Sequence, residues 1–480
     1  MDGNSSWLPD EIQLESGAGV RAIVVAGTTS GVGKTTVATG LIGTLHKRNF
    51  KVQPFKAGPD YIDPTYHTWV SGELSRNLDT WLMSHNAIIE LFTRATRGKD
   101  IAVIEGVMGL YDGRSSMSEE GSTAELAKFL GAPVLLVVDS RKGARSLAAM
   151  VAGYRNFDAS LCLGGVVLNG IGSDEHLRLC REAIECYTGL PVLGYLPRRD
   201  SLSLPERHLG LIPTVEGATS EEFLRLLVTQ CEATLDIPQI LRLSEQAVTP
   251  RAEPVLFPQM RRPAMAKIAV AKDKAFSFYY QDSLDLLEAW GAEIVPFGPL
   301  EDAGLPQDIS GLYIGGGFPE LYAAGLADNK SIRQAIKVAS GRGMPIYAEC
   351  GGLMYLGRSI RDLQGDEHPM VGVIPVSSRI DSPRLSLGYR TVQALGDGPI
   401  LRQGEIVRGH EFHWSVLKNN ADSPKAYRIL EKDGCQEGFQ KKQLLASYIH
   451  LHLGSLPHMA SHFVENCRQF RDSCNCEELP

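Results

Sequence analysis

A glycine-rich segment with one lysine and two threonines has the composition of a phosphate-binding loop. Residues 22–36 read A-I-V-V-A-G-T-T-S-G-V-G-K-T-T, and apolar residues then recur at helical spacing from Val37 to Leu45. This pattern predicts a strand, a turn and a helix. Backbone N–H groups and the positive end of the helix dipole would surround a phosphate. The predicted nucleotide-binding residues of this segment are Gly27, Thr28, Ser30, Gly31, Val32, Gly33, Lys34, Thr35 and Thr36.

The lysine and the first threonine have separate predicted roles. Lys34 reaches the outer phosphates of ATP, and Thr35 ligates Mg²⁺. The loop is one residue longer than G-x4-G-K-T, because five residues separate Gly27 from Gly33. This longer loop resembles that of the dethiobiotin synthetase type, whose members phosphorylate a carboxylate or a carbamate. A glycine-rich turn that binds nothing is the alternative, and the coincidence of strand, glycines, Lys-Thr and helix disfavours it.

Acidic residues follow two further predicted strands. Glu105 ends the apolar run Ile101–Ile104, and Asp60 lies in K-A-G-P-D-Y-I-D-P-T-Y-H, residues 56–67. Two prolines and a glycine predict a loop there. Because ligands of open parallel sheets bind at the carboxyl ends of the strands, we expect Asp60, Glu105 and Thr35 to hold Mg²⁺. A turn-forming Asp and a structural Glu are the alternatives.

Other side chains at the same edge are predicted to contact the ligands. Asn169 follows an apolar run and would hydrogen-bond a purine base, or else it forms an Asn-Gly turn. Tyr111 and Asp112 lie in a turn that we expect to close over the site. The predicted substrate contacts are Asp60, Tyr61, Asp63, Tyr111 and Asp112.

A cysteine in the second half of the chain has the surroundings of a nucleophile. The run Pro345–Ala348 leads into Glu-Cys-Gly-Gly, and apolar residues after Gly352 begin a helical pattern. A sharp strand-to-helix turn would expose the sulfur of Cys350, and the helix N-terminus would favour its thiolate. Gly351 and the glycines Gly315–Gly317 are candidates to donate N–H groups to an oxyanion, chiefly Gly316 and Gly317. A buried structural cysteine is the alternative.

A thiol nucleophile needs a base, and four of the histidines that follow Cys350 are candidates. His450 lies 100 residues after the cysteine, a separation that fits a Cys-His glutamine amidotransferase, so we expect it to be the base and hold His452 in reserve. No acidic residue stands two positions after His450, where many such enzymes have one. Glu411 or His452 would orient the base, or there is no third member. The supporting candidates are His410, Glu411, His413 and His452.

Apolar runs alternate with helical patterns in both halves, which predicts an α/β fold with a doubly wound parallel sheet in the first half. Five prolines between Pro238 and Pro263 interrupt the pattern. After Cys350 the chain becomes β-rich, with predicted strands at 371–376, 387–395 and 407–416. The predicted parts are an N-terminal extension 1–19, a P-loop domain 20–236, a linker 237–265, an amidotransferase domain 266–467 and a tail 468–480.

The composition excludes several classes of protein. The chain of 480 residues has 48 basic and 56 acidic residues and no basic block, which makes nucleic acid an unexpected partner. No apolar stretch approaches the roughly 20 residues of a membrane span, and we expect no membrane association. The nine cysteines show no C-x2-C pairs, and the first 20 residues show no signal peptide. This usage predicts a cytoplasmic protein.

The motifs together resemble those of the cobyrinic acid a,c-diamide synthase family, over roughly residues 20–455 and in family order. The resemblance implies a dethiobiotin-synthetase-like domain and a class I-like glutamine amidotransferase domain. The matching segments are the phosphate loop, K-A-G-P-D-Y-I-D-P-T-Y-H, R-N-L-D at 76–79, V-I-E-G-V-M-G-L-Y-D-G, F-S-F-Y-Y, Y-I-G-G-G-F-P-E-L-Y-A, A-E-C-G-G-L-M-Y-L, L-G-Y-R at 387–390 and R-G-H-E-F-H-W-S.

The resemblance also implies a reaction. Cys350 would attack the glutamine side chain while His450 carries the proton, and the released ammonia would displace phosphate from an acyl phosphate made with ATP and Mg²⁺. The amidated groups would be the a and c carboxylates of cobyrinic acid, in cobalamin biosynthesis. Hydrogenobyrinic acid and nickel sirohydrochlorin are alternative substrates, and a homodimer is expected from the family alone. A P-loop ATPase with an inactive amidase-like regulatory domain is the alternative from another class, and it predicts a broken elbow.

Overall fold

The computed structural model describes residues 20–202, 206–207, 210–211, 213–214, 217, 220–248, 251, 253–380, 385–418 and 423–477. The predicted extension 1–19 lies outside these residues. The chain forms two compact units, which divide between Pro254 and Val255.

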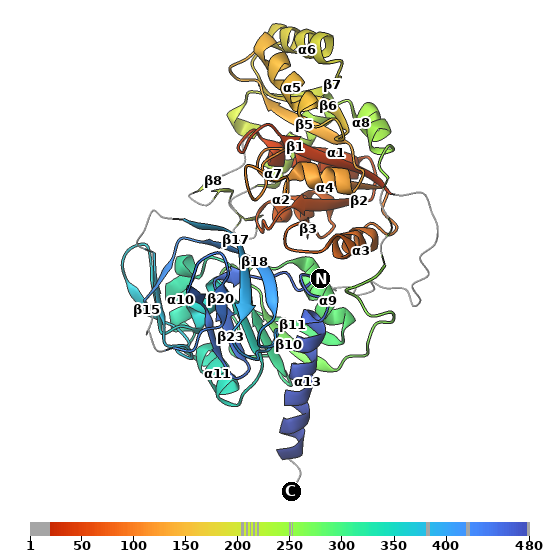
Figure 1. The fold of residues 1–480 in the computed structure, drawn as a ribbon. Helices are drawn as coiled ribbons and strands as arrows, with labels where there is room; N and C mark the ends of the chain where they lie inside the picture. The colour runs from red at the N-terminus through yellow and green to blue at the C-terminus, as the bar shows by residue number, and fades with distance from the viewer. Residues whose placement is uncertain are drawn as a thin grey trace. The chain divides into compact units, whose positions relative to one another are not determined.

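In the first unit, the described residues form a parallel seven-stranded sheet in the order β3-β2-β4-β1-β5-β6-β7 (Figure 1). Strands β2, β3 and β4 lie on one side of β1, and after β4 the chain crosses to β5 on the other side of β1. This reversal makes the carboxyl end of β1 the expected ligand crevice. The strands are β1 Arg21–Gly27, β2 Val52–Ala57, β3 Arg76–Leu78, β4 Ile101–Glu105, β5 Val134–Asp139, β6 Leu163–Ile171 and β7 Val192–Pro197, with a short pair β8 Glu206–Arg207 and β9 Gly210–Leu211.

Helices cover this sheet because both faces of its strands are apolar. Ile23 and Val25 of β1 belong to a core with three helices, α1, α7 and α8, while Ala22 and Val24 are buried on the opposite face. The predicted doubly wound fold is therefore confirmed. The helices are α1 Lys34–Lys47, α2 Asp63–Ser71, α3 His85–Ala95, α4 Thr123–Phe129, α5 Arg145–Phe157, α6 Asp174–Thr188, α7 Glu221–Thr234 and α8 Ile237–Ser244, with a 3-10 turn at Asp200–Leu202.

Two segments of the first unit differ from the expected pattern. The predicted loop 56–67 is a loop only between Ala57 and Asp63, because β2 extends to Ala57 and α2 begins at Asp63 with a proline in its first turn. The predicted linker 237–265 contains α8. Its Ile237, Ile240 and Leu243 are buried in the core of the first unit.

The second unit contains a six-stranded sheet among its described residues, in the order β11-β10-β12-β13-β23-β22, with only β22 antiparallel. The strands are β10 Ala266–Ala271, β11 Ala292–Phe297, β12 Gly311–Ile314, β13 Ile346–Glu349, β22 Phe439–Lys441 and β23 Leu444–Ser447. The helices are α9 Gln281–Ala289, α10 Ala323–Asp328, α11 Lys330–Gly341, α12 Gly351–Leu356 and α13 Met459–Glu477, with a 3-10 turn at Pro319–Tyr322.

Two smaller sheets complete this unit. Only Tyr448 separates β23 from β24, so the chain passes there from the six-stranded sheet into a five-stranded one. The five-stranded sheet has β21 Gln436–Glu437, β20 Tyr427–Ile429, β17 Ser386–Ala394, β18 Ile406–His413 and β24 Ile449–His450. The other has β15 Glu367–Pro369, β14 Ser359–Arg361, β16 Ser377–Arg379 and β19 Val416–Lys418.

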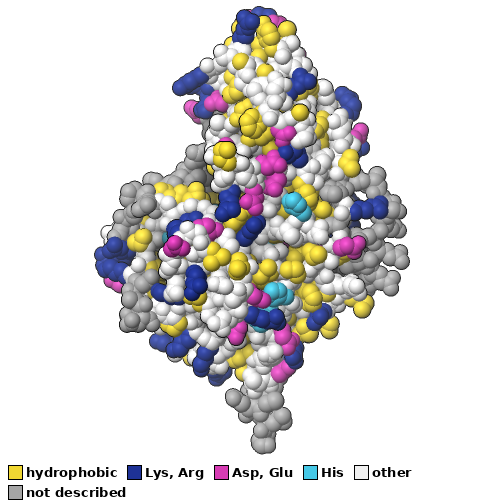
Figure 2. Space-filling model, in the orientation of Figure 1, with side chains coloured by type: hydrophobic (Ala, Val, Ile, Leu, Met, Phe, Trp, Pro, Cys, Tyr) yellow, Lys and Arg dark blue, Asp and Glu magenta, His cyan; other side chains and the backbone are white. Residues whose placement is uncertain are grey.

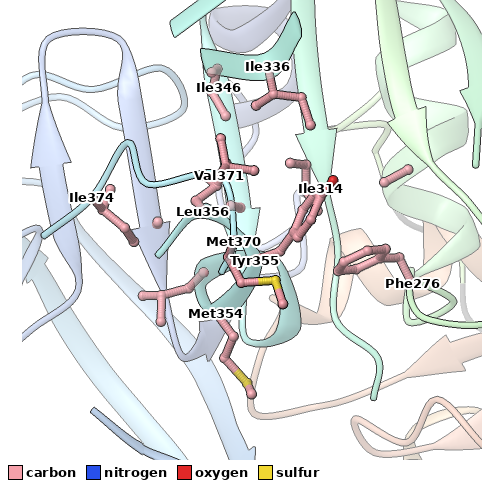
Figure 3. Packing of buried hydrophobic residues seen from close by; sticks show 14 of the residues in the cluster. Phe276, Ile314, Ile336, Ile346, Met354, Tyr355, Leu356, Met370, Val371 and Ile374 are labelled. Carbon is pink, nitrogen blue, oxygen red and sulfur yellow. The ribbon is translucent and has the colours of Figure 1, made fainter. Parts of the chain in front are cut away.

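The core of the second unit explains one wrong prediction. Val371, Ile374 and Val376 are apolar and buried as a strand would be, but they pack against the short helix α12, beside Leu356 (Figure 3). Residues 371–376 form no strand. The predicted strand 407–416 is divided, because β18 ends at His413 and β19 begins at Val416.

Helix hydropathy and the distribution of surface charge can be compared with what a membrane span or a charged patch would need. Within the described residues, no helix has the length and apolar character needed to cross a bilayer. On the face shown in Figure 2, Lys and Arg side chains are interspersed with Asp, Glu and apolar side chains.

The close approach of α12 to β12 gives a stability prediction. A Cβ atom at Gly352 would lie 2.2 Å from the backbone oxygen of Ile314, so we expect Gly352→Ala to destabilise the fold by about 1–3 kcal/mol. Gly341, at the end of α11, has open space for a Cβ, and Gly341→Ala is the matched control, expected to be neutral or stabilising by up to about 1 kcal/mol. Calorimetric unfolding of the whole chain checks both, and equal effects would contradict the packing argument.

Candidate functional site

The phosphate loop has the predicted form. It connects β1 to α1, and Gly31 and Gly33 have φ angles of 76° and 92°, which L side chains rarely adopt. The Lys34 ammonium turns back over the loop and donates to the carbonyls of Thr29 at 3.2 Å and Met108 at 2.5 Å. Backbone groups thus hold this cation at the place where phosphates would bind.

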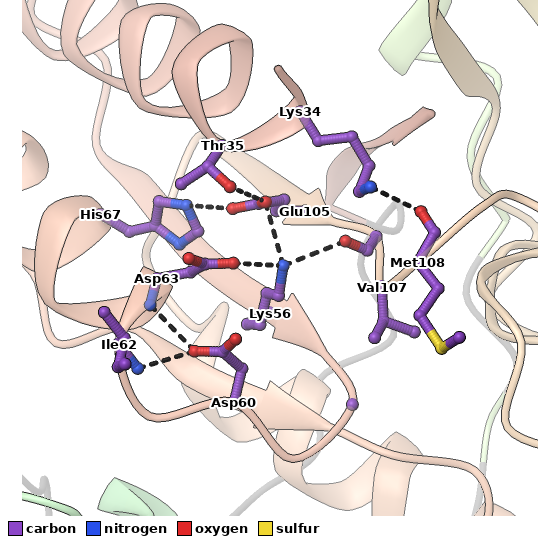
Figure 4. A network of polar contacts seen from close by, with 12 residues as sticks. Lys34, Thr35, Lys56, Asp60, Ile62, Asp63, His67, Glu105, Val107 and Met108 are labelled. Atoms are coloured by element: carbon purple, nitrogen blue, oxygen red, sulfur yellow. Dashed lines mark hydrogen bonds and ion pairs between the residues drawn. The ribbon is translucent and has the colours of Figure 1, made fainter. Parts of the chain in front are cut away.

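A buried carboxylate joins the loop to the neighbouring strands (Figure 4). Glu105 ends β4, fully buried, and its Oε1 accepts from the Thr35 hydroxyl at 2.6 Å and from Lys56 Nζ at 2.9 Å. Its Oε2 lies 2.7 Å from His67 Nε2. Parallel register places Lys56 directly beside Glu105. The structure therefore brings Thr35 and Glu105 together as predicted, and it adds Lys56 and His67.

The electrostatics follow from this pairing. Burial alone would raise the pKa of Glu105, but Lys56 and His67 outweigh it and hold that pKa well below its usual range. For a lysine, burial acts in the opposite direction and would lower the pKa. The charges of Asp63 and Glu105 outweigh burial and raise the pKa of Lys56. For Lys34, burial and the charge of Lys56 outweigh the nearby carboxylates and lower its pKa to about 8.

The two aspartates of the former loop lie differently. Asp60 Oδ1 accepts the backbone N–H groups of Ile62 at 2.7 Å and Asp63 at 3.0 Å, so it shapes the turn that starts α2. Asp63 lies on α2 and its carboxylate pairs with Lys56 Nζ at 2.6 Å. Burial, with the nearby charge of Asp60, pushes the pKa of Asp63 upward, and the pairing with Lys56 opposes that rise. Tyr61, which lies between Asp60 and Asp63 in the sequence, is buried.

The remaining predicted contacts have identified partners. Asn169 belongs to β6, not to a turn, and its Nδ2 donates to the carbonyl of Val32 in the phosphate loop at 2.9 Å. Tyr111 donates its hydroxyl to the carbonyl of Tyr154 at 2.6 Å, and Asp112 accepts the N–H of Gly109 at 3.0 Å. The turn expected to close over the site is thus fastened by hydrogen bonds.

The second unit contains a nucleophile elbow. Cys350 joins β13 to α12 with φ of 47° and ψ of −101°, a strained conformation for a residue other than glycine. Its N–H donates to the carbonyl of Ser447 at 2.7 Å, and its sulfur lies 3.8 Å from the carbonyl oxygen of Phe412. Burial, followed by the charge of Glu320, raises the pKa of the thiol, so a base must take its proton.

The glycines of the predicted oxyanion site lie beside the elbow. Gly352 donates to the carbonyl of Gly315, and a Cβ atom at Gly351 would lie 3.1 Å from the nitrogen of Gly317. Gly315 donates its own N–H to the hydroxyl of Tyr279 at 2.8 Å, which removes it from the candidates. Gly316, Gly317 and Gly351 remain predicted donors.

The histidines separate into different environments. His410 and His450 are direct cross-strand partners on β18 and β24, with ring centroids 6.4 Å apart. A Cβ atom at Gly316 would lie 2.7 Å from His450 Cε1, so the His450 ring lies against the predicted oxyanion loop. Burial, followed by the charge of His450, lowers the pKa of His410 to about 3, and this histidine is neutral at pH 7.

The comparisons with known proteins cover nearly the whole chain. A family model described as the CobQ/CobB/MinD/ParA nucleotide binding domain matches residues 23–212, and one described as the CobB/CobQ-like glutamine amidotransferase domain matches residues 267–457. A cobyrinate a,c-diamide synthase from Dehalococcoides mccartyi strain CBDB1 is 46% identical over 93% of this chain and 98% of its own length. The chain belongs to the cobyrinate a,c-diamide synthase family.

Other members of the cobyrinate a,c-diamide synthase family agree. The Salmonella typhimurium protein of that name is 44% identical and the Synechococcus one 42%, each over 93% of this chain and 98% of its own length. Among solved structures, a glutamine amidotransferase covers 42% of this chain at 16% identity and a TM-score of 0.32, a likeness too weak to carry an argument. The family establishes a glutamine-dependent, amide-forming ligase with a P-loop nucleotide-binding domain and an amidotransferase domain, as predicted.

Sequence reasoning missed a carboxylate that contacts His450, the predicted base. The carboxylate of Glu349, the residue before the nucleophile, lies 3.4 Å from His450 Nδ1. The expected candidates are engaged elsewhere, since Glu411 contacts Arg390 Nε at 2.8 Å and His413 Nε2 at 2.9 Å. The sequence shows Glu349 at the end of a predicted strand, next to the predicted nucleophile. It does not show that His450, 101 residues later, is its partner.

The burial and charge of Lys34 give a pH prediction. Its protonated form would bind phosphates, and with a pKa of about 8 it is mostly charged below pH 8 and mostly neutral above. We therefore expect the dissociation constant of ATP to rise roughly tenfold from pH 7 to pH 9, measured by calorimetric titration. Lys34→Met should bind weakly with little pH dependence. A wild-type constant that does not change over this range would contradict the assignment.

Proposed function

We propose that this chain converts the a and c carboxylates of cobyrinic acid to amides, using ATP and glutamine-derived ammonia, in cobalamin biosynthesis. The observation that carries the proposal is an unbroken elbow at Cys350 in the same chain as a complete phosphate loop, in a family whose members bear this activity in their names. The ATPase with an inactive amidase-like domain predicts a broken elbow, so the geometry disfavours it.

The two sites meet two chemical needs. A carboxylate is a poor electrophile at neutral pH, so ATP must first convert it to an acyl phosphate. Lys34 and the N–H groups of the phosphate loop would hold the transferred phosphoryl group. Lys56 is the cation between Glu105 and Asp63, and it would face the incoming carboxylate at the same strand ends.

Mg²⁺ is part of the proposal for the first site. Among the described residues, no group of three or more His, Cys, Asp or Glu side chains would by itself hold a metal ion. The Thr35 hydroxyl and the Glu105 carboxylate nevertheless supply oxygen ligands of the kind that Mg²⁺ takes alongside nucleotide phosphates. When bound, Mg²⁺ would neutralise phosphate charge. Asp60 is a weaker candidate, because its carboxylate already accepts two backbone N–H groups.

An aromatic surface supports a flat macrocycle as substrate. The Tyr111 ring lies 5.6 Å from that of Tyr154 and 4.6 Å from that of Phe157, which is 75% exposed. Tyr154 donates its hydroxyl to the carbonyl of Thr28, so the surface adjoins the phosphate loop. An exposed Phe157 and two half-buried tyrosines next to the predicted phosphate site would provide an apolar face for a tetrapyrrole, and we assign Tyr111 that contact.

Further parts of the proposal rest on the family. We place the chain in the cytoplasm, where ATP, glutamine and reduced thiols are available, as a homodimer without a nucleic-acid or membrane partner. Sedimentation of the purified chain would measure the oligomeric state.

The substrate is tested by offering three macrocycles in parallel. With ATP, Mg²⁺ and glutamine, we expect cobyrinic acid to gain two amides, read by mass spectrometry. Hydrogenobyrinic acid and nickel sirohydrochlorin are the competing substrates. Amidation of one of these alone would replace the cobalt substrate in the proposal, and ATP hydrolysis without any amide would overturn it.

The division between the two sites is tested with Cys350→Ser. Serine lacks the thiolate, so we expect glutamine-dependent amidation to fall at least about 1,000-fold, while amidation with added ammonium salt stays within about threefold of wild type. The two rates are measured on the same preparation. Loss of both would place Cys350 in a structural role.

A further inference from the structure

The position that usually holds the acid of a Cys-His-acid triad is occupied here by a histidine that cannot serve. His452 is fully buried, and burial lowers its pKa to about 3, so it is neutral at pH 7. Its Nδ1 accepts the N–H of Gly454 at 3.0 Å, and its ring lies 4.9 Å from that of Tyr280. His452 therefore supports the local backbone.

Another carboxylate reaches the base from the opposite direction in the chain. Glu349, the last residue of β13, is 1% exposed, and its Oε2 lies 3.4 Å from His450 Nδ1. Its Oε1 accepts the N–H of Leu451, the residue after the base, at 2.9 Å. One carboxylate thus contacts both the imidazole and the backbone next to it.

Neutral donors complete the surroundings of this carboxylate. Tyr347 donates its hydroxyl to Glu349 Oε1, and the Tyr313 hydroxyl lies 3.4 Å from Oε2. Burial, followed by the charge of Glu349, raises the pKa of both tyrosines, so they remain protonated donors. A buried carboxylate needs such compensation, and the donors leave one side of it facing His450.

We propose that Glu349 is the positioning residue of the glutaminase reaction, so that the triad has its acid immediately before the nucleophile and none after the base. The carboxylate accepts the Nδ1 proton of His450 and thereby fixes the tautomer in which Nε2 is the free base. The inference rests on the glutamine hydrolysis of the proposed function, and Glu349 acts only through His450.

The chemistry then proceeds with these groups in place. His450 Nε2 takes the proton of the Cys350 thiol, and the thiolate sulfur forms a bond to the amide carbon of glutamine. The imidazolium returns that proton to the amide nitrogen, the carbon–nitrogen bond breaks and ammonia leaves. Water then hydrolyses the thioester to glutamate and restores the thiol.

The substitution Glu349→Gln tests the proposal. An amide keeps an oxygen for Leu451 but presents an N–H group to Nδ1, which favours the tautomer protonated on Nε2 and removes the base. We expect kcat for glutamine hydrolysis to fall at least about 100-fold with the KM for glutamine within about threefold, because exchange of a triad Asp for Asn acts through the tautomer in the same way. Amidation with ammonium salt should remain at the wild-type rate.

Glu437 offers a matched control in the same unit. It is a buried carboxylate that accepts the Ser447 hydroxyl at 2.5 Å and the Tyr448 N–H at 2.8 Å. Burial raises the pKa of Glu437 to about 7, so the assay is run at about pH 8.5. There Glu437→Gln removes a buried charge without touching the base, and it should keep kcat within about threefold. A fall equal to that of Glu349→Gln would make the effect one of lost charge, against the proposal.

A double substitution separates positioning from packing. On a His450→Ala background, Glu349→Gln should cause no further loss of kcat, because its effect passes through the imidazole. An additive further loss, or a single-variant kcat within about threefold of wild type, overturns the proposal.

If Glu349→Gln also loses ammonia-dependent amidation, the variant Glu349→Asp replaces it in the test. Aspartate keeps the negative charge but is too short to reach Nδ1 of His450, so an unchanged kcat for glutamine hydrolysis overturns the proposal. Absence of any amide product in wild type, with either nitrogen source, would instead count against the proposed function.

Discussion

A carboxylate removed from water must be matched by cations or hydrogen-bond donors, and this constraint organises both units. Glu105 and Glu349 each end a central parallel strand, and each is almost inaccessible to solvent. Placing a charge there fixes what surrounds it. The surrounding strands and helices must supply compensating groups, and around Glu105 those groups lie at the predicted phosphate site.

The two units satisfy the constraint by different means. Around Glu105 the compensating cation is Lys56, which lies between two carboxylates, and His67 contacts the second oxygen of Glu105. A strongly paired, charged cluster of this kind suits phosphoryl chemistry, in which charge must be neutralised. Around Glu349 the compensation is neutral, from two tyrosines and a backbone N–H, which leaves the carboxylate's negative charge to act on a single imidazole. That arrangement suits proton transfer.

Features that depend on adjacent residues were predictable from the sequence. The phosphate loop, its helix and the strand–Cys350–helix turn are local patterns, and the structure has them where they were expected. Contacts between segments far apart in the sequence could not be predicted, because they depend on which strands pair and in which register. Nothing near Lys56 in the sequence reveals that Glu105 lies beside it, and Glu349 and His450 are similarly joined only by the fold.

Other errors had physical causes of their own. The apolar run 371–376 has the composition of a strand, yet it packs on α12 without entering a ladder, because burial of side chains does not require strand pairing. The segment 56–67 was read as a loop because of its prolines, although Pro64 stands in the first turn of a helix, where its missing N–H costs nothing.

The passage of the chain between two sheets at Tyr448 has a mechanical consequence. Cys350 follows a strand of the six-stranded sheet and His450 ends a strand of the five-stranded one, so the distance between the predicted nucleophile and the predicted base depends on how the two sheets are held together. The hydrogen bond from the Leu451 N–H to Glu349 connects the segment that follows β24 to the end of β13. The rate at which the Leu451 N–H exchanges with deuterium therefore measures how often this hydrogen bond between the two sheets opens, whether or not glutamine is hydrolysed.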